Sequence, residues 1–293
     1  GDWQRLGPPQ PNMYFCIDLP QLRVVCIDTG IEGRLDYEQG QWLRKVSADP
    51  RPKLLISGKP IYYDAGVSPR RILPSGGRGG QGETLLEIIQ DVSFNYRAVL
   101  SGDVHNYQRY PVRQADGRDI QFVVCGGGGA FMTATHKIPA VDLPGVSEQQ
   151  FVCYPQRGDS LRAYSIVYQW LRTGQGRRRN MRSKLRRRKV AGIPADEAAV
   201  IVAQRHGLPM APELRDVVVS ERSRQLAQRV FGIDRRSGPW EVSELLDWDC
   251  PPLFKSFLRL SVGDGGVDVE CFAVNGLPSD SDPSLIDSVR IDF

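Results

Sequence analysis

The sequence predicts a mixed α/β fold in which a β-sheet domain is interrupted by a helical insertion, and three observations predict it. Strand and helix patterns alternate over residues 13–125. From 160 to 244 the pattern becomes helical and rich in Arg, Gln and Ala, and alternating strand patterns then return over 253–274. We therefore expect a discontinuous domain at residues 1–160 and 249–293, with a helical, partly basic insertion at 161–248.

Short strands and helices alternate in the first half of the chain. Runs of β-branched and aromatic residues predict five strands, at 13–17, 22–27, 53–57, 96–100 and 120–125. Helical spacing of apolar residues predicts helices at 35–46 and 83–94. Between these two helices the Gly-rich stretch 74–82 predicts a mobile loop.

The second half predicts helices followed by a hairpin. Helical patterns occur at 195–206 and 215–231. Alternating strands at 253–262 and 267–274 are joined by Gly263-Asp264-Gly265-Gly266, a strong hairpin signal. The chain is therefore expected to return to a sheet after the insertion.

Composition fits a globular domain and argues against a membrane span or a disulfide scaffold. The 293 residues are 41% hydrophobic and 25% charged, and no run of about 18 uncharged apolar residues occurs. The six cysteines are scattered singly, and the first residues lack the order of a signal peptide. These features predict a reducing compartment and a cytoplasmic location.

Positive charge is concentrated in one segment. The net charge is +4, but residues 176–189 alone hold nine Lys or Arg and no acidic residue. The segment 177–189 either binds an anionic partner, such as nucleic acid or an acidic lipid, or is a solvated excursion. It contains no aromatic residue, so base stacking is not indicated.

The most specific motif is Ser101-Gly102-Asp103-Val104-His105, directly after the predicted strand 96–100. In an extended loop, Asp103 and His105 can offer a carboxylate oxygen and an imidazole nitrogen to neighbouring metal ions. Alternatively, Asp103 caps the turn and His105 packs against nearby tyrosines.

Other candidates have a functional and a structural interpretation. Lys59 and Arg109 either bind phosphate oxygens or are solvated surface cations. The glycines at 126–129 either present backbone N–H groups to an anion or form a simple turn. His136 either faces a substrate or is structural.

Residues 101–110 resemble the last metal-binding block of the calcineurin-like metallophosphoesterases, in the Gly-Asp-x-His form of a bacterial branch. Other segments match the family in the same order. Residues 13–42 resemble its strand and "Gln…Trp-Leu" helix, 127–139 the block after the ligand loop, and 251–276 the closing hairpin of its second sheet.

The resemblance implies a four-layer αββα sandwich and hydrolysis of a phosphomono- or phosphodiester. It implies two divalent transition-metal ions, Mn, Fe, Zn or Co, near the strand ends. His105 would be a ligand of one metal and Asp103 a ligand, or a water-mediated neighbour, of the other, and both would be catalytic residues. In the hypothesised hydrolysis, we place Lys59, Asn106, Arg109 and His136 near the phosphoester substrate.

Part of the family's ligand set is absent from this sequence. No second Asp-x-His, no Gly-Asp-x-x-Asp and no Gly-Asn-His occurs, and Gly58 stands where the family usually has a His. The resemblance therefore implies that an upstream segment or a second chain completes the site. The alternative is a non-catalytic remnant of the family that acts as a binding module through its basic insertion.

Overall fold

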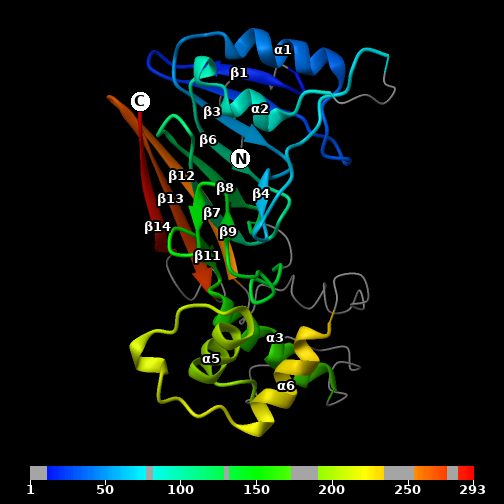
Figure 1. Cartoon of the computed structure of the whole chain (residues 1–293), viewed down its shortest axis with the longest axis vertical. Helices are drawn as coiled ribbons and strands as arrows, with labels where there is room; N and C mark the ends of the chain where they lie inside the picture. Colours follow the sequence, from blue (N-terminus) through cyan, green and yellow to red (C-terminus); the bar gives the residue numbers. More distant parts are fainter. Residues whose placement is uncertain (1–11, 77–81, 129–131, 173–190, 234–253, 276–282) are drawn as a thin grey trace, which may run out of the picture.

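Parallel pairing of buried strands builds the main sheet. The computed structural model describes residues 12–76, 82–128, 132–172, 191–233, 254–275 and 283–293. Within them, a mixed sheet has the order β1-β2-β3-β6-β8-β7-β11 (Figure 1). Its strands are β1 (Phe15–Asp18), β2 (Arg23–Ile27), β3 (Lys53–Ser57), β6 (Tyr96–Ser101), β7 (Tyr107–Arg113), β8 (Asp119–Cys125) and β11 (Val152–Tyr154). Strands β2, β3, β6 and β8 run parallel, so their carboxyl ends share one edge.

Two short hairpins border this sheet. One pairs β4 (Tyr62–Tyr63) with β5 (Gly66–Val67), and the other pairs β9 (Asp142–Leu143) with β10 (Val146–Ser147). Strands β3, β6 and β8 are almost entirely buried, as expected for parallel strands covered on both faces.

Helices α1 (Tyr37–Ser47) and α2 (Leu85–Gln90) cover one face of the main sheet. Helix α1 begins at Asp36, whose side chain accepts a hydrogen bond from the backbone N of Gln39 at 2.7 Å. The single helix predicted at 83–94 is wrong, because α2 ends at Gln90, with Asp91 as its C-cap, and a 3₁₀ turn (Val92–Phe94) follows. The Asp91 carboxylate accepts from the backbone N of Ser93, which starts the new turn.

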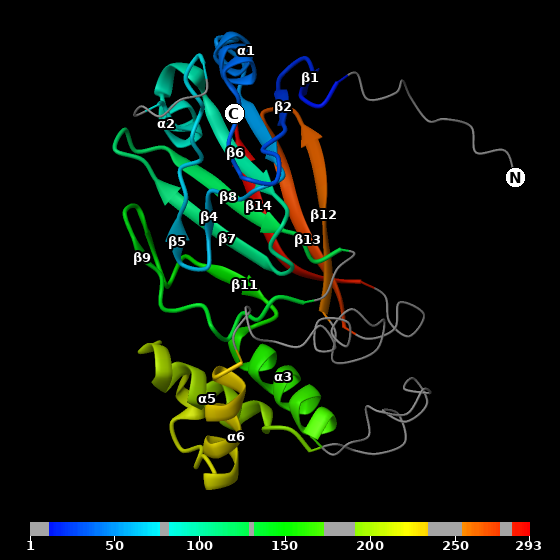
Figure 2. The same ribbon diagram turned by 90° about the vertical axis from the view of Figure 1, so that its right-hand side faces the viewer.

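A three-stranded antiparallel sheet packs against the other face of the main sheet (Figure 2). It comprises β12 (Phe254–Gly263), β13 (Gly266–Asn275) and β14 (Ser284–Asp292). Apolar side chains from both sheets share one core, which includes Leu54, Leu100 and Val123 from the first and Val267, Val269 and Cys271 from the second. The α/β sandwich is thus present, and the described residues form its helix, sheet and sheet layers.

The remaining helices gather at one end of the sheets (Figure 1). They are α3 (Arg157–Arg172), α5 (Ala195–His206), a 3₁₀ turn (Pro212–Leu214) and α6 (Glu221–Phe231), which share a core built around Leu161, Ala198, Leu226 and Val230. Helix α6 begins after the capping residue Ser220 and not at 215 as predicted, because the Ser220 hydroxyl accepts from the backbone N of Ser223.

Some sequence predictions fall outside the described residues. The whole basic segment 176–189 and residues 77–81 of the Gly-rich loop are among them. In the part that is described, no helix combines the length and apolar character needed to cross a membrane. The five cysteines in this part are free thiols.

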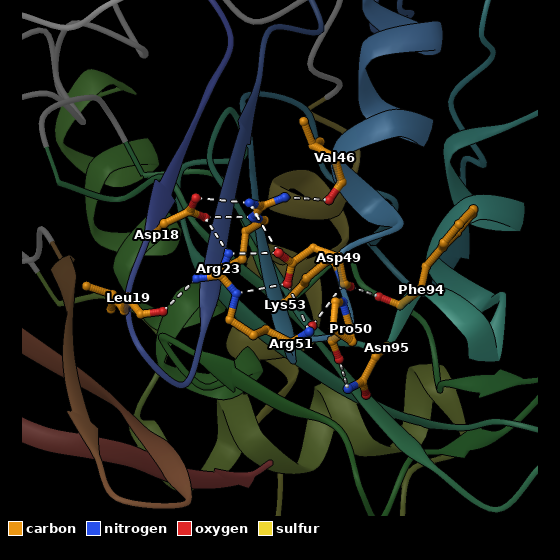
Figure 3. Close-up of polar contacts among 10 residues, drawn as sticks. All are labelled: Asp18, Leu19, Arg23, Val46, Asp49, Pro50, Arg51, Lys53, Phe94 and Asn95. Atoms are coloured by element: carbon orange, nitrogen blue, oxygen red, sulfur yellow. Dashed lines mark hydrogen bonds and ion pairs between the residues drawn. The ribbon is translucent and has the colours of Figure 1, made fainter.

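Lys53 organises the amino edge of the main sheet, opposite the edge where the parallel strands end (Figure 3). Its side chain is fully buried, and its ammonium donates to the carbonyl oxygens of Asp49, Arg51 and Phe94, the last two at 2.8 Å. The guanidinium of Arg51 donates twice to the Asp49 carboxylate, both times at 2.8 Å. These contacts hold together the chain segments that lead into β3 and β6.

Replacing Lys53 with Met is expected to lower the free energy of unfolding by about 2–3 kcal/mol, because three carbonyl groups lose a charged donor. Urea unfolding followed by circular dichroism measures the change. Lys45→Met is the matched control, since Lys45 is exposed in the last turn of α1, and it should change stability by less than about 0.5 kcal/mol. Equal losses in both variants would mean that the buried ammonium contributes nothing specific.

Candidate functional site

Four loops converge where the parallel strands β2, β3, β6 and β8 end. They comprise residues 28–30, 58–60, 102–105 and 126–128. Neighbouring loops are tied directly, since the backbone N of Lys59 donates to Thr29 Oγ1 at 3.1 Å and the backbone N of Gly126 donates to the carbonyl of Val104 at 3.1 Å. In open α/β sheets this edge is where ligands bind.

Lys59 and Asp103 meet at the centre of this edge. The Lys59 ammonium lies 2.6 Å from Asp103 Oδ1, and the side chains are 24% and 45% exposed. The two residues come from loops after adjacent strands, 44 positions apart in the sequence. The pair is therefore open to solvent and to an incoming anion.

The loop that carries Asp103 is tightly folded. Asp103 has a φ of 64°, in the left-handed region that non-glycine residues rarely adopt. The backbone N of Val104 donates to the carbonyl of Gly102, and that of Asn106 to the carbonyl of Val104, both at 2.8 Å. These bonds, together with Lys59, direct the carboxylate toward the loop after β3.

His105 sits on the same loop, and Thr133 fixes its backbone. Its N–H donates to Thr133 Oγ1 at 3.3 Å, and its carbonyl accepts from the backbone N of Thr133 at 3.0 Å. The residue is half-buried. The two predicted metal ligands therefore share a rigid turn at the carboxyl edge.

Two further residues hold the loops of the site in place, and neither was among the predicted site residues. Thr29 is buried and accepts the hydrogen bond from Lys59. Gln39, on α1, accepts from the backbone N of Asp28 and donates to its carbonyl, both at 2.8 Å. A buried amide that satisfies both groups of one peptide segment explains why a glutamine stands on the inner face of this helix.

Asn106 was predicted near the substrate, but its side chain faces the interior. It is 2% exposed, its Nδ2 donates to the carbonyl of Thr133, and its Oδ1 accepts from Gln108 Nε2 at 2.9 Å. Gln108 also contacts the Asp64 carboxylate at 2.9 Å. Asn106 thus supports the loop from behind and does not reach solvent.

Arg109 is also placed away from the predicted phosphate position. It lies on β7, between the two sheets, and its Nε and Nη2 contact Asp287 of β14 at 2.6 and 3.1 Å. Both side chains are largely buried, at 14% and 11% exposure. In this arrangement the guanidinium joins the sheets.

His136 lies in the interior of the molecule, beside the helical cluster. Its side chain is fully buried, and Nδ1 is 2.9 Å from Ser160 Oγ on α3. Its ring packs edge-on against Tyr164 and Phe231, with centroids 5.1 Å away in each case. The structural interpretation of His136 fits these contacts, and a role facing substrate does not.

The glycine loop after β8 is shaped by close backbone approach. A Cβ on Gly126 would lie 2.5 Å from the carbonyl oxygen of Val104, and one on Gly127 would lie 2.9 Å from Ser256 Oγ. Gly126 therefore requires glycine, because the backbone of the loop 102–105 passes against it, and Gly127 lies close to β12. Gly129 lies outside the described residues.

The residues at this edge do not by themselves fit a transition-metal site. Over the described ranges, no group of three or more His, Cys, Asp or Glu side chains is placed to hold a metal ion. Such ions commonly take four or more ligands. A metal on Asp103 would also have to displace the Lys59 ammonium from the same carboxylate.

No protein-family model matches the sequence, and no curated protein matches it. Among solved structures, the purple acid phosphatase PPD1 from seeds of yellow lupin (Lupinus luteus) is similar at a TM-score of 0.31 with 19% sequence identity. The similarity covers 43% of this chain and 25% of that chain, so this chain spans about a quarter of the phosphatase's length.

Proposed function

We propose that this chain forms part of a phosphoester hydrolase whose substrate phosphate binds at the carboxyl edge of the main sheet. The observation that carries the proposal is the exposed Lys59–Asp103 pair, with its 2.6 Å contact, where the loops after four parallel strands converge. The Gly-Asp-x-His motif on the same loop supports it.

Phosphoryl transfer depends mainly on positioning and on stabilising negative charge. Lys59 provides a cation for the phosphate oxygens, and Asp103 holds that cation in place. The imidazole of His105, on the same turn, provides ring nitrogens that can donate or accept a hydrogen bond. Completion of a metal centre with Mn, Fe, Zn or Co would require ligands from outside the described residues, from an upstream segment or from a second chain.

A second function is a phosphoester-binding module without turnover. The ion pair favours it, because the Lys59 ammonium already neutralises the carboxylate that a metal would use. The basic segment 177–189, through which such a module was predicted to bind an anionic partner, lies outside the described residues. This alternative predicts anion binding at Lys59 with no hydrolysis.

Hydrolysis of p-nitrophenyl phosphate and bis-p-nitrophenyl phosphate, with added Mn²⁺ or Zn²⁺, tests the proposal. Lys59→Met and His105→Ala are each expected to lower kcat/KM by about 100-fold, because each removes a group that stabilises or protonates the reacting phosphoester. Elemental mass spectrometry on protein purified without chelators reports any bound metal in parallel.

Lys45→Met serves as the control for loss of a positive charge, because Lys45 lies on the outer surface of α1. Turnover that survives both site substitutions would overturn the assignment of these residues. Phosphate binding that depends on Lys59, without turnover under any metal, would leave the binding module as the function.

A further inference from the structure

Arg70 is held beside Lys59 by contacts within the same edge of the sheet. Its Nε donates to the carbonyl oxygen of Pro60 at 2.8 Å, and its Nη2 donates to the same oxygen. Its guanidinium also lies over the ring of Tyr63, 5.7 Å from the centroid. Because Pro60 directly follows Lys59, these contacts fix the guanidinium next to the Lys59 loop.

Gly33, in the loop after β2, lies against both the Arg70 and the Lys59 side chains. A Cβ on Gly33 would lie 2.6 Å from Arg70 Nη1 and 3.6 Å from Lys59 Cγ. The absence of a side chain therefore lets both cationic side chains pass against this loop. Among the contacts of the described residues, Nη1 makes no hydrogen bond, in contrast to Nε and Nη2.

Backbone conformation indicates that the position of Arg70 is imposed by its surroundings. Its φ is 59°, in the left-handed region, as is the φ of Asp103 at 64°. Such conformations are unfavourable for non-glycine residues and persist where the surrounding structure determines them. Here the carbonyl of Arg70 accepts from the backbone N of Leu85 at 2.7 Å, while its neighbour Arg71 bridges to Thr84.

We infer that Arg70 is a second phosphate-binding residue and that, with Lys59, it makes the site select a dianionic terminal phosphate over a phosphodiester. This inference rests on the proposed function. A terminal phosphate carries about two charges and three unesterified oxygens, whereas a diester carries one charge and two such oxygens. The Lys59–Asp103 pair carries no net charge by itself, so the Arg70 guanidinium supplies the net positive charge that favours the dianion over the monoanion.

The structural alternative is that Arg70 only stabilises the turn through Pro60. Arg70→Gln retains a donor for the Pro60 carbonyl and removes the charge. Isothermal titration with inorganic phosphate then measures the anion site without reference to turnover. We expect Arg70→Gln to weaken phosphate binding about tenfold, and the ratio of monoester to diester kcat/KM to fall by a similar factor.

Arg113→Gln is the matched control, because Arg113 lies at the far end of β7, pairs with Asp119 and is 60% exposed. Phosphate affinity and the monoester to diester ratio should not change in this variant. If Arg70→Gln behaves in the same way while wild-type protein binds phosphate, the inference is wrong and the proposed function stands. If wild-type protein binds no phosphate, both fail.

A pair of glycine substitutions tests the same point without altering Arg70. Gly33→Ala places a methyl group against Nη1 and should weaken phosphate binding. Gly117→Ala, in the turn between β7 and β8, introduces a similar backbone strain, since φ is 69° at Gly33 and 87° at Gly117, but its Cβ would meet nothing within 4 Å. Equal phosphate affinity in these two variants would refute the role of Arg70.

Discussion

Asp287→Ala is expected to lower the free energy of unfolding by about 3–5 kcal/mol, because it leaves the Arg109 guanidinium buried without its counter-ion. Asp287 accepts from Arg109 and also from Tyr107 Oη at 2.7 Å, so one substitution removes the acceptor of two buried donors. Burial alone would raise the pKa of Asp287, but the hydrogen bonds from Arg109 and Tyr107 outweigh it and hold that pKa below its usual value. The carboxylate is therefore charged in the folded protein at neutral pH.

Urea unfolding at pH 7.5 measures this loss. Glu270→Ala is the matched control, because Glu270 pairs with Arg259 on the same small sheet, where Arg259 is 59% exposed, and it should cost less than about 1 kcal/mol. A double variant, Arg109→Leu with Asp287→Leu, should recover part of the stability by replacing the pair with apolar side chains. If Asp287→Ala costs no more than the control, the pair does not stabilise the joint between the sheets.

Sequence reasoning located the carboxyl edge because its signals are local. Each strand that ends there is a short apolar run followed at once by glycine or polar residues, as in β3 (Lys53–Ser57) and β6 (Tyr96–Ser101). Parallel pairing then brings loops that follow different strands together. The proximity of Lys59 and Asp103 follows from those two facts, although their 2.6 Å ion pair does not.

The positions of Arg109 and His136 could not be read in the same way. Arg109 pairs with a residue 178 positions further along the chain, and β14, which carries that partner, was not predicted. His136 is enclosed by side chains from helices that follow it, including Phe231. The sequence around each residue is compatible with a binding site. Only contacts with distant parts of the chain show that both side chains are buried.

The role proposed for Arg70 could not have been predicted from the sequence. Its importance depends on a left-handed backbone and on the approach of Gly33, neither of which leaves a signal in the residues around it. The arginine pair at 70 and 71 has no distinctive spacing relative to the motif at 101–105. Only the approach of the Arg70 and Lys59 side chains to one glycine in the folded structure indicates it.

The fold is expected to lose stability between pH 6.5 and pH 4.5 because of His136. Burial, and then the positive charges of Lys137, His206 and Arg205, lower the pKa of His136 to about 3. In the unfolded chain this pKa is about 6.5. Below pH 6.5 the unfolded chain therefore binds a proton that the folded chain does not, and stability falls with pH until about pH 3.

The expected loss from this group is about 2–3 kcal/mol at pH 4.5 and about 4–5 kcal/mol over the full window. Urea unfolding at pH 7.5, 5.5 and 4.5 measures it, and wild type and variant are compared at each pH because glutamates, with a pKa near 4.3, titrate at the low end of this range. His136→Leu should be less stable than wild type at pH 7.5, since it loses the contact with Ser160, yet it should lose much less stability as the pH falls.

His206 contributes in the same direction, because burial also lowers its pKa, so some pH dependence should persist in His136→Leu. His206→Gln then serves as the comparison, and its slope should stay close to that of wild type, because His206 is less buried than His136. An unchanged slope in His136→Leu would show that this histidine is not held neutral by its surroundings. A weaker dependence of unfolding free energy on pH in His136→Leu would identify the buried, uncharged imidazole of His136 as the acid-sensitive group. This imidazole packs against α3 and α6.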